Sequence, residues 1–172
     1  MTRGRPNPRY WTIPQRLRRA RKALGLSCSA LSVAAGVGRC AATMIENGIR
    51  IPRLPMVEQL ARVLGLSPSH LAFGFELPVD PYEGTRSAGF AARLREARSL
   101  RDVTVRELGR ASGVVEGTVR AMERGTMPQV DTVEAVAKAL GVSPAWLAFG
   151  EGPRELRKRG TRDPSSPSMS LV

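Results

Sequence analysis

The sequence of 172 residues predicts an all-α protein that contains two tandem copies of one five-helix unit. Three observations predict this fold: an internal repeat, apolar residues at helical spacing, and helix start and stop signals in the same order in both copies. The repeat is clearest in residues 64–74, LGLSPSHLAFG, and residues 140–150, LGVSPAWLAFG, which share eight of eleven letters. Self-similarity at a fixed offset indicates a repeated structural unit.

The likeness extends upstream through the whole unit. Residues 16–38 align with residues 93–115 at an offset of 77, and one extra residue in the first copy changes the offset to 76 for the shared phrase. Units of about 60 residues can fold, although so small a body buries little surface. We therefore expect a basic, disordered head over 1–13, a first domain over 14–74, a Pro-containing linker over 75–87, a second domain over 88–150 and a disordered tail over 151–172.

The first two helices of each unit are indicated by apolar spacing and by caps. Leucine and alanine at helical intervals predict a first helix over about 14–24 and about 88–100. Ser27 and Thr104 stand where the N-cap of a second helix belongs. That helix should end at residues 35 and 112, before glycines that accept a left-handed backbone.

The third helix begins after only two or three further residues. We expect it over 39–47 in the first copy and over 116–124 in the second, closed by Gly48 and Gly125. Two helices joined by a short glycine-containing turn form a helix-turn-helix arrangement.

The fourth and fifth helices have their own start signals. In the second copy the letters DTVE predict a capping box, with Asp131 as the cap and Glu134 three residues later. The first copy has Pro55 in the first turn instead. The letters SP at 67–68 and at 143–144 predict a cap followed by proline at the start of the fifth helix.

Charge is the most informative part of the composition. Lys and Arg number 27 against 15 Asp and Glu, a net charge of +12, and no acidic residue precedes Glu46. The first copy (16–74) has nine basic and two acidic residues, whereas the second (93–150) has nine and seven. Such an excess favours a polyanionic partner through counterion release. An arginine-rich genome would give the same composition with a basic surface that is merely solvated.

Other classes of protein find little support in the sequence. No apolar run is long enough for a membrane-spanning helix, and the basic N-terminus lacks the apolar segment of a secretory signal. Cys28 and Cys40 have no counterparts in the second copy, which argues against a disulfide framework or zinc site and leaves a reducing cytoplasm as the expected compartment. No phosphate loop, metal cluster or nucleophile–base set is present, so we expect neither an enzyme nor a cofactor.

The pattern S/T-x3-L-x2-A-x-G-V-x7-E-x-G occurs in both copies. It resembles the DNA-binding domains of the phage-repressor (Cro/CI-like, XRE) family, and the phrase at 140–150 resembles that family's fifth helix. The resemblance covers about 120 residues and implies two lambda-repressor-like domains that bind double-stranded DNA in a sequence-specific manner, as transcriptional regulators do. The residues that carry it are Ser27, Leu31, Ala34, Gly36, Val37, Glu46 and Gly48, and then Thr104, Leu108, Ala111, Gly113, Val114, Glu123 and Gly125.

The resemblance also implies which residues contact DNA. The third helix would enter the major groove, where the guanidinium of Arg39 can read guanine and the carboxylate of Glu116 can accept a bond from cytosine. Glycine and alanine make that face thin in the second copy, so its helix-turn-helix could instead serve packing or protein pairing. The expected base contacts are Arg39, Cys40, Thr43 and Met44, and then Glu116 and Arg120, with Gly117 and Ala121 beside them.

Contacts to the DNA backbone are expected from helix N-termini and from the loop after the third helix. Losing a loop arginine should weaken binding to all sequences alike and lower the salt slope by about one. The first copy would then supply most DNA contacts. The residues are Ser27, Cys28, Arg50, Arg53, Thr104 and Val105.

Two further sets of residues have other expected roles. By the same resemblance, Arg21 with Glu46 and Arg98 with Glu123 form structural salt bridges between the first and third helices. Arg3 and Arg5 lie in the letters RGRP, similar to the core of an AT-hook, and could form a minor-groove arm. A plain basic leader is the simpler interpretation of these four letters.

The linker allows two arrangements of the copies. Fifteen residues, 75–89, can reach at most about 50 Å, more than the roughly 34–36 Å between successive half-sites, so one chain could act as a built-in pseudo-dimer. The apolar linker residues could also dock the copies rigidly. An alternative function is a protein-interaction or homodimerisation module, especially in the second copy, which is nearly neutral.

Overall fold

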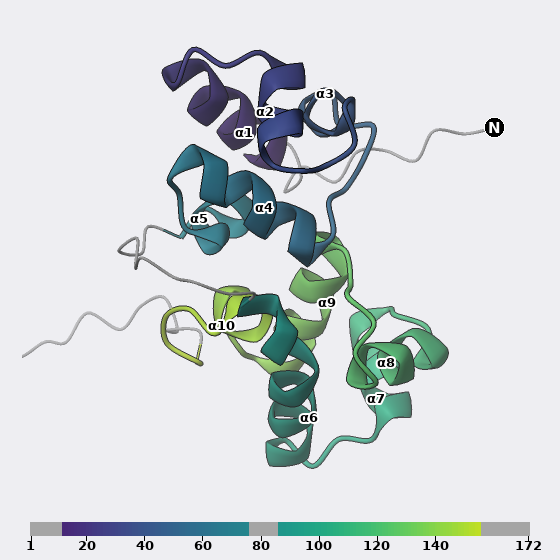
Figure 1. Ribbon diagram of the computed structural model, residues 1–172. Helices are drawn as coiled ribbons and strands as arrows, with labels where there is room; N and C mark the ends of the chain where they lie inside the picture. The colour runs from purple at the N-terminus through teal and green to yellow at the C-terminus, as the bar shows by residue number, and fades with distance from the viewer. Residues whose placement is uncertain (1–11, 76–85, 156–172) are drawn as a thin grey trace, which may run out of the picture.

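The computed structural model describes residues 12–75 and 86–155. Within these ranges every regular element is helical, and the only strand-like pairings are two isolated bridges. The predicted all-α fold with two tandem five-helix units is therefore confirmed (Figure 1). The first unit comprises α1 (Thr12–Ala23), α2 (Cys28–Ala34), α3 (Ala41–Glu46), α4 (Leu54–Leu64) and α5 (Pro68–Phe73); the second comprises η1 (Arg86–Gly89), α6 (Phe90–Leu100), α7 (Val105–Ser112), α8 (Glu116–Glu123), α9 (Val130–Leu140) and α10 (Pro144–Phe149).

Most helix boundaries follow the predicted start and stop signals. Ser27 and Thr104 cap α2 and α7 with their side-chain oxygens, and Ser67 caps α5 by accepting from the N–H of His70 at 3.0 Å. The glycines after these elements have positive φ, for example Gly113 at 71°, which only glycine adopts without steric cost.

The predicted capping box DTVE was wrong. The N-cap of α9 is Gln129, and Asp131 lies inside the first turn, where its carboxylate accepts from Thr132. The helix starts earlier because Gln129 pairs with Arg53 of the first domain in an antiparallel bridge. A contact between domains, rather than a local cap, sets this boundary.

The third helix of the first copy is shorter than predicted. α3 begins at Ala41, because Arg39 and Cys40 lie in a turn closed by a bond from Ala41 N–H to Gly38 O at 2.7 Å. The hydroxyl of Ser32, on α2, accepts from the N–H of Ala42 at 3.1 Å. The second copy has Gly109 in place of Ser32, and the turn approaches so closely that a Cβ there would lie 2.8 Å from the carbonyl oxygen of Val114.

The two domains dock against each other through matched residues. Leu54 N–H donates to Pro128 O and Val130 N–H donates to Pro52 O, both at 3.2 Å. Because equivalent positions exchange the same bond, the interface has approximate two-fold symmetry. The rings of Phe73 and Phe149, also equivalent, meet with centroids 6.2 Å apart.

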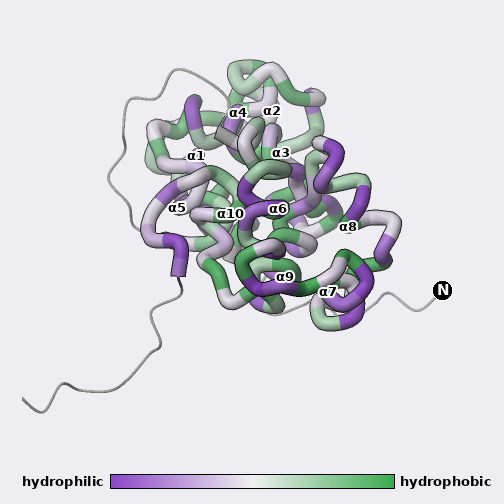
Figure 2. Tube along the Cα trace, turned by 90° about the horizontal axis from the view of Figure 1, so that it is seen from below, coloured by the Kyte–Doolittle hydropathy of each residue, from purple (hydrophilic) through white to green (hydrophobic). Residues whose placement is uncertain are grey.

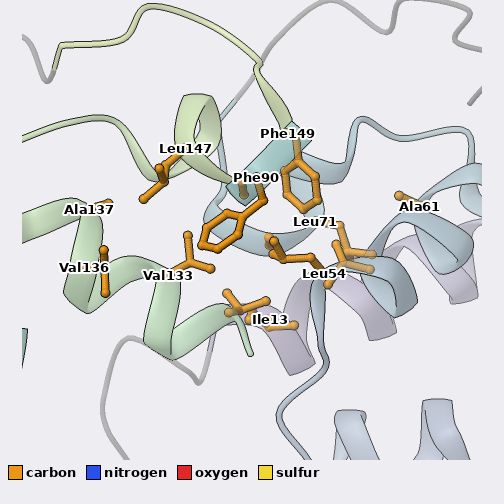
Figure 3. Packing of buried hydrophobic residues seen from close by; sticks show 14 of the residues in the cluster. Ile13, Leu54, Ala61, Leu71, Phe90, Val133, Val136, Ala137, Leu147 and Phe149 are labelled. Carbon is orange, nitrogen blue, oxygen red and sulfur yellow. The ribbon is translucent and has the colours of Figure 1, made fainter. Parts of the chain in front are cut away.

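The hydrophobic core runs without a break through this interface. Figure 3 shows Phe90 and Phe149 of the second domain lying beside Leu54 and Leu71 of the first. Phe90 is fully buried, and its equivalent in the first copy is Ile13, which is 4% exposed. The copies are thus docked, the second of the two arrangements that the linker allowed.

Two buried carboxylates extend the docking surface with hydrogen bonds. Glu58 of α4 accepts from the N–H of Ser87 at 2.8 Å and from its hydroxyl at 2.7 Å. Glu151 accepts from the N–H of Ser69 at 3.2 Å. Each carboxylate therefore satisfies one N–H group in the first turn of a helix in the other domain.

Residues 151–155, expected in the disordered tail, are ordered against the second domain. Ser143 N–H donates to Arg154 O at 2.8 Å, and Val142 forms a bridge with Glu155. The guanidinium of Arg154 lies 5.0 Å from the ring centroid of Trp146. This segment packs on the second domain.

Candidate nucleic-acid interface

The outer face of the first domain's third helix carries the residues expected to meet bases. Thr43 and Met44 are exposed on α3, and Arg39 and Cys40 are exposed in the turn that leads into it. The opposite face of α3 is buried in the core. A cation, a thiol, a hydroxyl and a thioether therefore face solvent along about two turns.

The equivalent face of the second domain carries an ion pair. Arg120 Nη2 lies 2.6 Å from Glu116 Oε1, and Arg120 Nε lies 3.2 Å from the same oxygen. Gly117 beside them is exposed, whereas Ala121 is half-buried. From the sequence, Glu116 and Arg120 are expected as separate base contacts, but their spacing of four residues on one helix is the signal for an ion pair.

The N-termini of α2 and α7 differ in charge. In the first domain Ser27 Oγ accepts from Ala30 N–H at 3.0 Å, Cys28 is half-buried, and no acidic residue lies in the first turn. In the second domain Thr104 and Glu107 form a complete capping box.

Glu107 was missed at the sequence level, although the letters TVRE at 104–107 are a capping-box pattern. Its carboxylate accepts from the N–H and the hydroxyl of Thr104, both at 2.8 Å. The backbone bond, and then the side-chain bond, lower the pKa of Glu107. A carboxylate therefore lies at this helix N-terminus, next to the half-buried Val105, where a phosphate had been expected.

The loop arginines of the first domain lie in two settings. Arg50 is exposed in the loop after α3. Arg53 is also exposed, but it is the N-cap of α4 and its backbone pairs with Gln129 across the domain interface. Arg53 therefore lies at the approximate two-fold axis.

Arginine–glutamate pairs tie the first helix of each domain to the third. Arg21 binds Glu46 through two bonds, Nε to Oε1 at 2.6 Å and Nη2 to Oε2 at 2.9 Å. Arg18 adds a third bond at 3.2 Å, and the Glu46 side chain is only 3% exposed. In the second domain Arg98 Nε lies 2.6 Å from Glu123 Oε1, with 13% of the carboxylate side chain exposed.

Ionisation of Glu46 is controlled by two opposing effects. Burial favours the neutral acid, but hydrogen bonds and charge from Arg21 and Arg18 outweigh it and lower the pKa of Glu46. The hydrogen bond to Glu46 also raises the pKa of Arg21. The pair is therefore fully charged at neutral pH and holds α3 at a set angle to α1.

A second arginine of each first helix, not assigned a role from the sequence, closes the other end of the domain. Arg16 donates to the carbonyl oxygens of Leu71 and Ala72 at 2.9 and 2.6 Å. Arg93 donates to the equivalent carbonyls of α10 at 2.9 and 2.7 Å. These bonds satisfy last-turn carbonyls that the helix leaves unpaired.

The two third helices lie on the same side of the molecule. In Figure 1, α5 and α10 face each other at the left of the interface, whereas α3 and α8 lie at the right-hand edge of their domains. Figure 2 shows hydrophilic stretches around α7 and α8, while α9 is largely hydrophobic. Thr43 and Met44 on α3 and Gly117 and Arg120 on α8 are exposed to solvent.

The expected minor-groove arm cannot be placed in the structure. Arg3 and Arg5 fall outside the described residues. Among residues 12–75 and 86–155, no group of three His, Cys, Asp or Glu side chains could hold a metal ion, and no helix is long and apolar enough to cross a membrane.

Comparison with known families defines the class of protein. Residues 15–73 match a family described as "Helix-turn-helix domain", and residues 94–147 match one described as "Helix-turn-helix". Two tandem helix-turn-helix domains are therefore confirmed, and the matches support the predicted resemblance to the Cro/CI (XRE) type.

One characterised relative shares part of this sequence. Over 63 residues the chain is 40% identical to the HTH-type transcriptional regulator PrtR of Pseudomonas aeruginosa. The match covers 37% of this chain and 25% of the relative, so the chain spans about a quarter of that regulator's length.

Proposed function

We propose that this protein is a sequence-specific double-stranded DNA-binding transcriptional regulator whose first domain makes most of the DNA contacts. The observation that carries the proposal is the presence of two docked helix-turn-helix domains with α3 and α8 on one side (Figure 1). In dimeric proteins of this kind, paired recognition helices enter successive major grooves about one helical turn apart. Here one chain supplies both.

The charge of the two domains supports the larger role of the first. Its α2 begins without an acidic residue, and Arg39 and Arg50 are exposed near α3. The second domain has Glu107 at the start of α7 and Glu116 at the start of α8, and both repel phosphates. The base contacts in the first domain would come from Arg39, Cys40, Thr43 and Met44, and the phosphate contacts from Ser27, Cys28, Arg50 and Arg53.

A binding assay with labelled duplex DNA across a salt series tests the proposal. We expect affinity to fall steeply with salt because phosphate contacts release counterions. Arg50→Ala should weaken binding to all sequences alike and lower the salt slope by about one. Absence of binding to any duplex at about 50 mM salt would reject the proposal.

A second candidate function is a protein-interaction module, in which α7 and α8 bind a protein. The acidic residues at the starts of these helices favour it. The α5–α10 surface is already occupied within one chain, so a homodimer would need another surface. Light scattering on the full chain discriminates, because a monomer in the absence of DNA argues against self-association.

A further inference from the structure

The third helices of the two domains place their arginines at different positions. Arg39 of the first domain aligns with Glu116 of the second, and Thr43 aligns with Arg120. The first arginine therefore lies in the turn before α3, whereas the second lies on the second turn of α8. Two guanidinium groups in one docked body thus occupy unequal places relative to the approximate two-fold axis.

The guanidinium of Arg120 is held along one edge. Its Nε and Nη2 atoms both donate to Glu116 Oε1, at 3.2 and 2.6 Å. The edge of the guanidinium that carries these two atoms is therefore occupied by the carboxylate. The other edge, which carries Nη1 and the second hydrogen of Nη2, has no bond to any described residue. Both side chains are accessible, with 61% of Arg120 and 39% of Glu116 exposed.

An arginine braced in this way suits a bidentate acceptor. The free edge presents two parallel N–H groups, the geometry that matches O6 and N7 of guanine in the major groove. An exposed pair on one helix contributes little to stability, so the pair's larger effect is on the orientation of Arg120. Glu116, although it repels phosphates, is thus also a positioning residue for Arg120.

We infer that one chain reads an asymmetric operator: two inverted half-sites of different sequence, with guanine recognised by Arg39 in one and by Arg120, braced by Glu116, in the other. This rests on the proposed function and specifies its ligand. A homodimer presents the same surface twice and therefore selects a palindrome. Because the two domains dock with two-fold symmetry, their half-sites should still be inverted relative to each other. Because the domains carry different residues, the two half-sites should differ in sequence, so the operator is not a palindrome.

Selection of bound duplexes from a random pool, using the full chain, tests the inference. We expect two dissimilar motifs in inverted order with centres about 10–10.5 base pairs apart, and one chain bound per duplex by light scattering. A palindromic motif, or two chains per duplex, would overturn it.

Single substitutions then assign the readers. Arg39→Ala should remove a guanine preference from one half-site only, and Arg120→Ala should remove one from the other. Each loss should lower discrimination by about 5- to 150-fold, the range for one bidentate contact. Arg95→Ala on α6 is the matched control, because it removes an exposed arginine outside the reading face.

The role of Glu116 needs its own variants. Glu116→Ala should relax the same base position as Arg120→Ala, while Glu116→Gln should retain part of the preference because its amide oxygen can still accept from Arg120. Uniformly tighter binding by both variants, without a change of motif, would show that Glu116 only repels phosphate and would overturn its positioning role.

The outcomes distinguish a failure of the proposed DNA-binding function from a failure of the asymmetric-operator inference. If the wild-type chain binds no duplex, the proposed function itself fails. If it binds specifically while Arg120→Ala weakens all duplexes equally, the function stands and the inference fails. Thermal melts show whether each variant is folded.

Discussion

The two domains share one framework and differ where that framework faces solvent. The framework includes an arginine clamp on the last turn of the closing helix, made by Arg16 and by Arg93. It also includes an ion pair between the first and third helices. On the outer faces, Arg39 aligns with Glu116 and Ala30 aligns with Glu107.

This comparison teaches that docking and reading are carried by different residues. The reciprocal backbone bonds at the interface need equivalent conformations in both copies, so the cores resemble each other. The outer faces of α3 and α8 are exposed at Thr43, Met44, Gly117 and Arg120, whereas the opposite face of each helix is buried in the core. The residues of the outer faces can therefore differ without disturbing the fold.

The largest expected effect comes from a core position that differs between the copies. Phe90→Ala should lower the free energy of unfolding by about 3–5 kcal/mol, because a fully buried ring is lost at the domain interface. Ile13→Val, at the equivalent position, should cost only about 0.5–1.5 kcal/mol. Urea denaturation measures both, and equal costs would show that the two sides of the interface contribute alike.

The loss of stability on breaking each ion pair should be larger where the carboxylate is more deeply buried. Arg21→Ala leaves the nearly buried Glu46 with only the half-exposed Arg18, and we expect a loss of about 3 kcal/mol. Arg98→Ala should cost less, because Glu123 is more accessible to water. Thermal melts of the two variants test the order, and a larger loss for Arg98→Ala would contradict it.

The turn before the third helix should be destabilised by opposite changes in the two copies, the addition of a side chain in the second and the removal of one in the first. Gly109→Ala adds a methyl group 2.8 Å from the carbonyl oxygen of Val114, a backbone atom that cannot easily move, and should destabilise by about 1–3 kcal/mol. The matched variant Ser32→Gly should also destabilise, because it leaves the buried Ala42 N–H unpaired. If Gly109→Ala left the stability unchanged, the turn of the second copy would be able to widen enough to accept a side chain, as the turn of the first copy accepts Ser32.

The smallest effect is confined to acid solution. The folded-state pKa of Glu46 lies below its unfolded value, so its contribution to stability is complete above the unfolded pKa and is lost as pH falls through the folded one. Stability should therefore decline below about pH 4.5 more steeply in the wild type than in Glu46→Gln. Denaturation at pH 7 and pH 3 measures this, and parallel profiles would contradict it.

Much of the fold was predictable because its signals are local. Caps such as Ser27, prolines in first turns and glycines after helices each act on neighbouring backbone, and they marked most helix boundaries within two residues. The outer residues of α3 and α8 were implied by the family resemblance. Whether those faces contact DNA stays a prediction.

The errors arose where distant residues decide the outcome. The start of α9 depends on Arg53 from the other domain, and the start of α3 depends on Ser32 from the preceding helix. Residues 151–155 looked like tail because nothing in their composition reveals the contact between Glu151 and Ser69.

By itself the sequence determined that two copies of a helix-turn-helix unit exist and that the positive charge is concentrated in the first copy. Only the tertiary structure decided that the copies dock with two-fold symmetry and that Glu116 holds Arg120. The reason is physical: caps, turns and periodicity act over a few residues. A docking surface depends on the shapes of two folded bodies, and a side-chain pair on the rotamers available once the helix has formed.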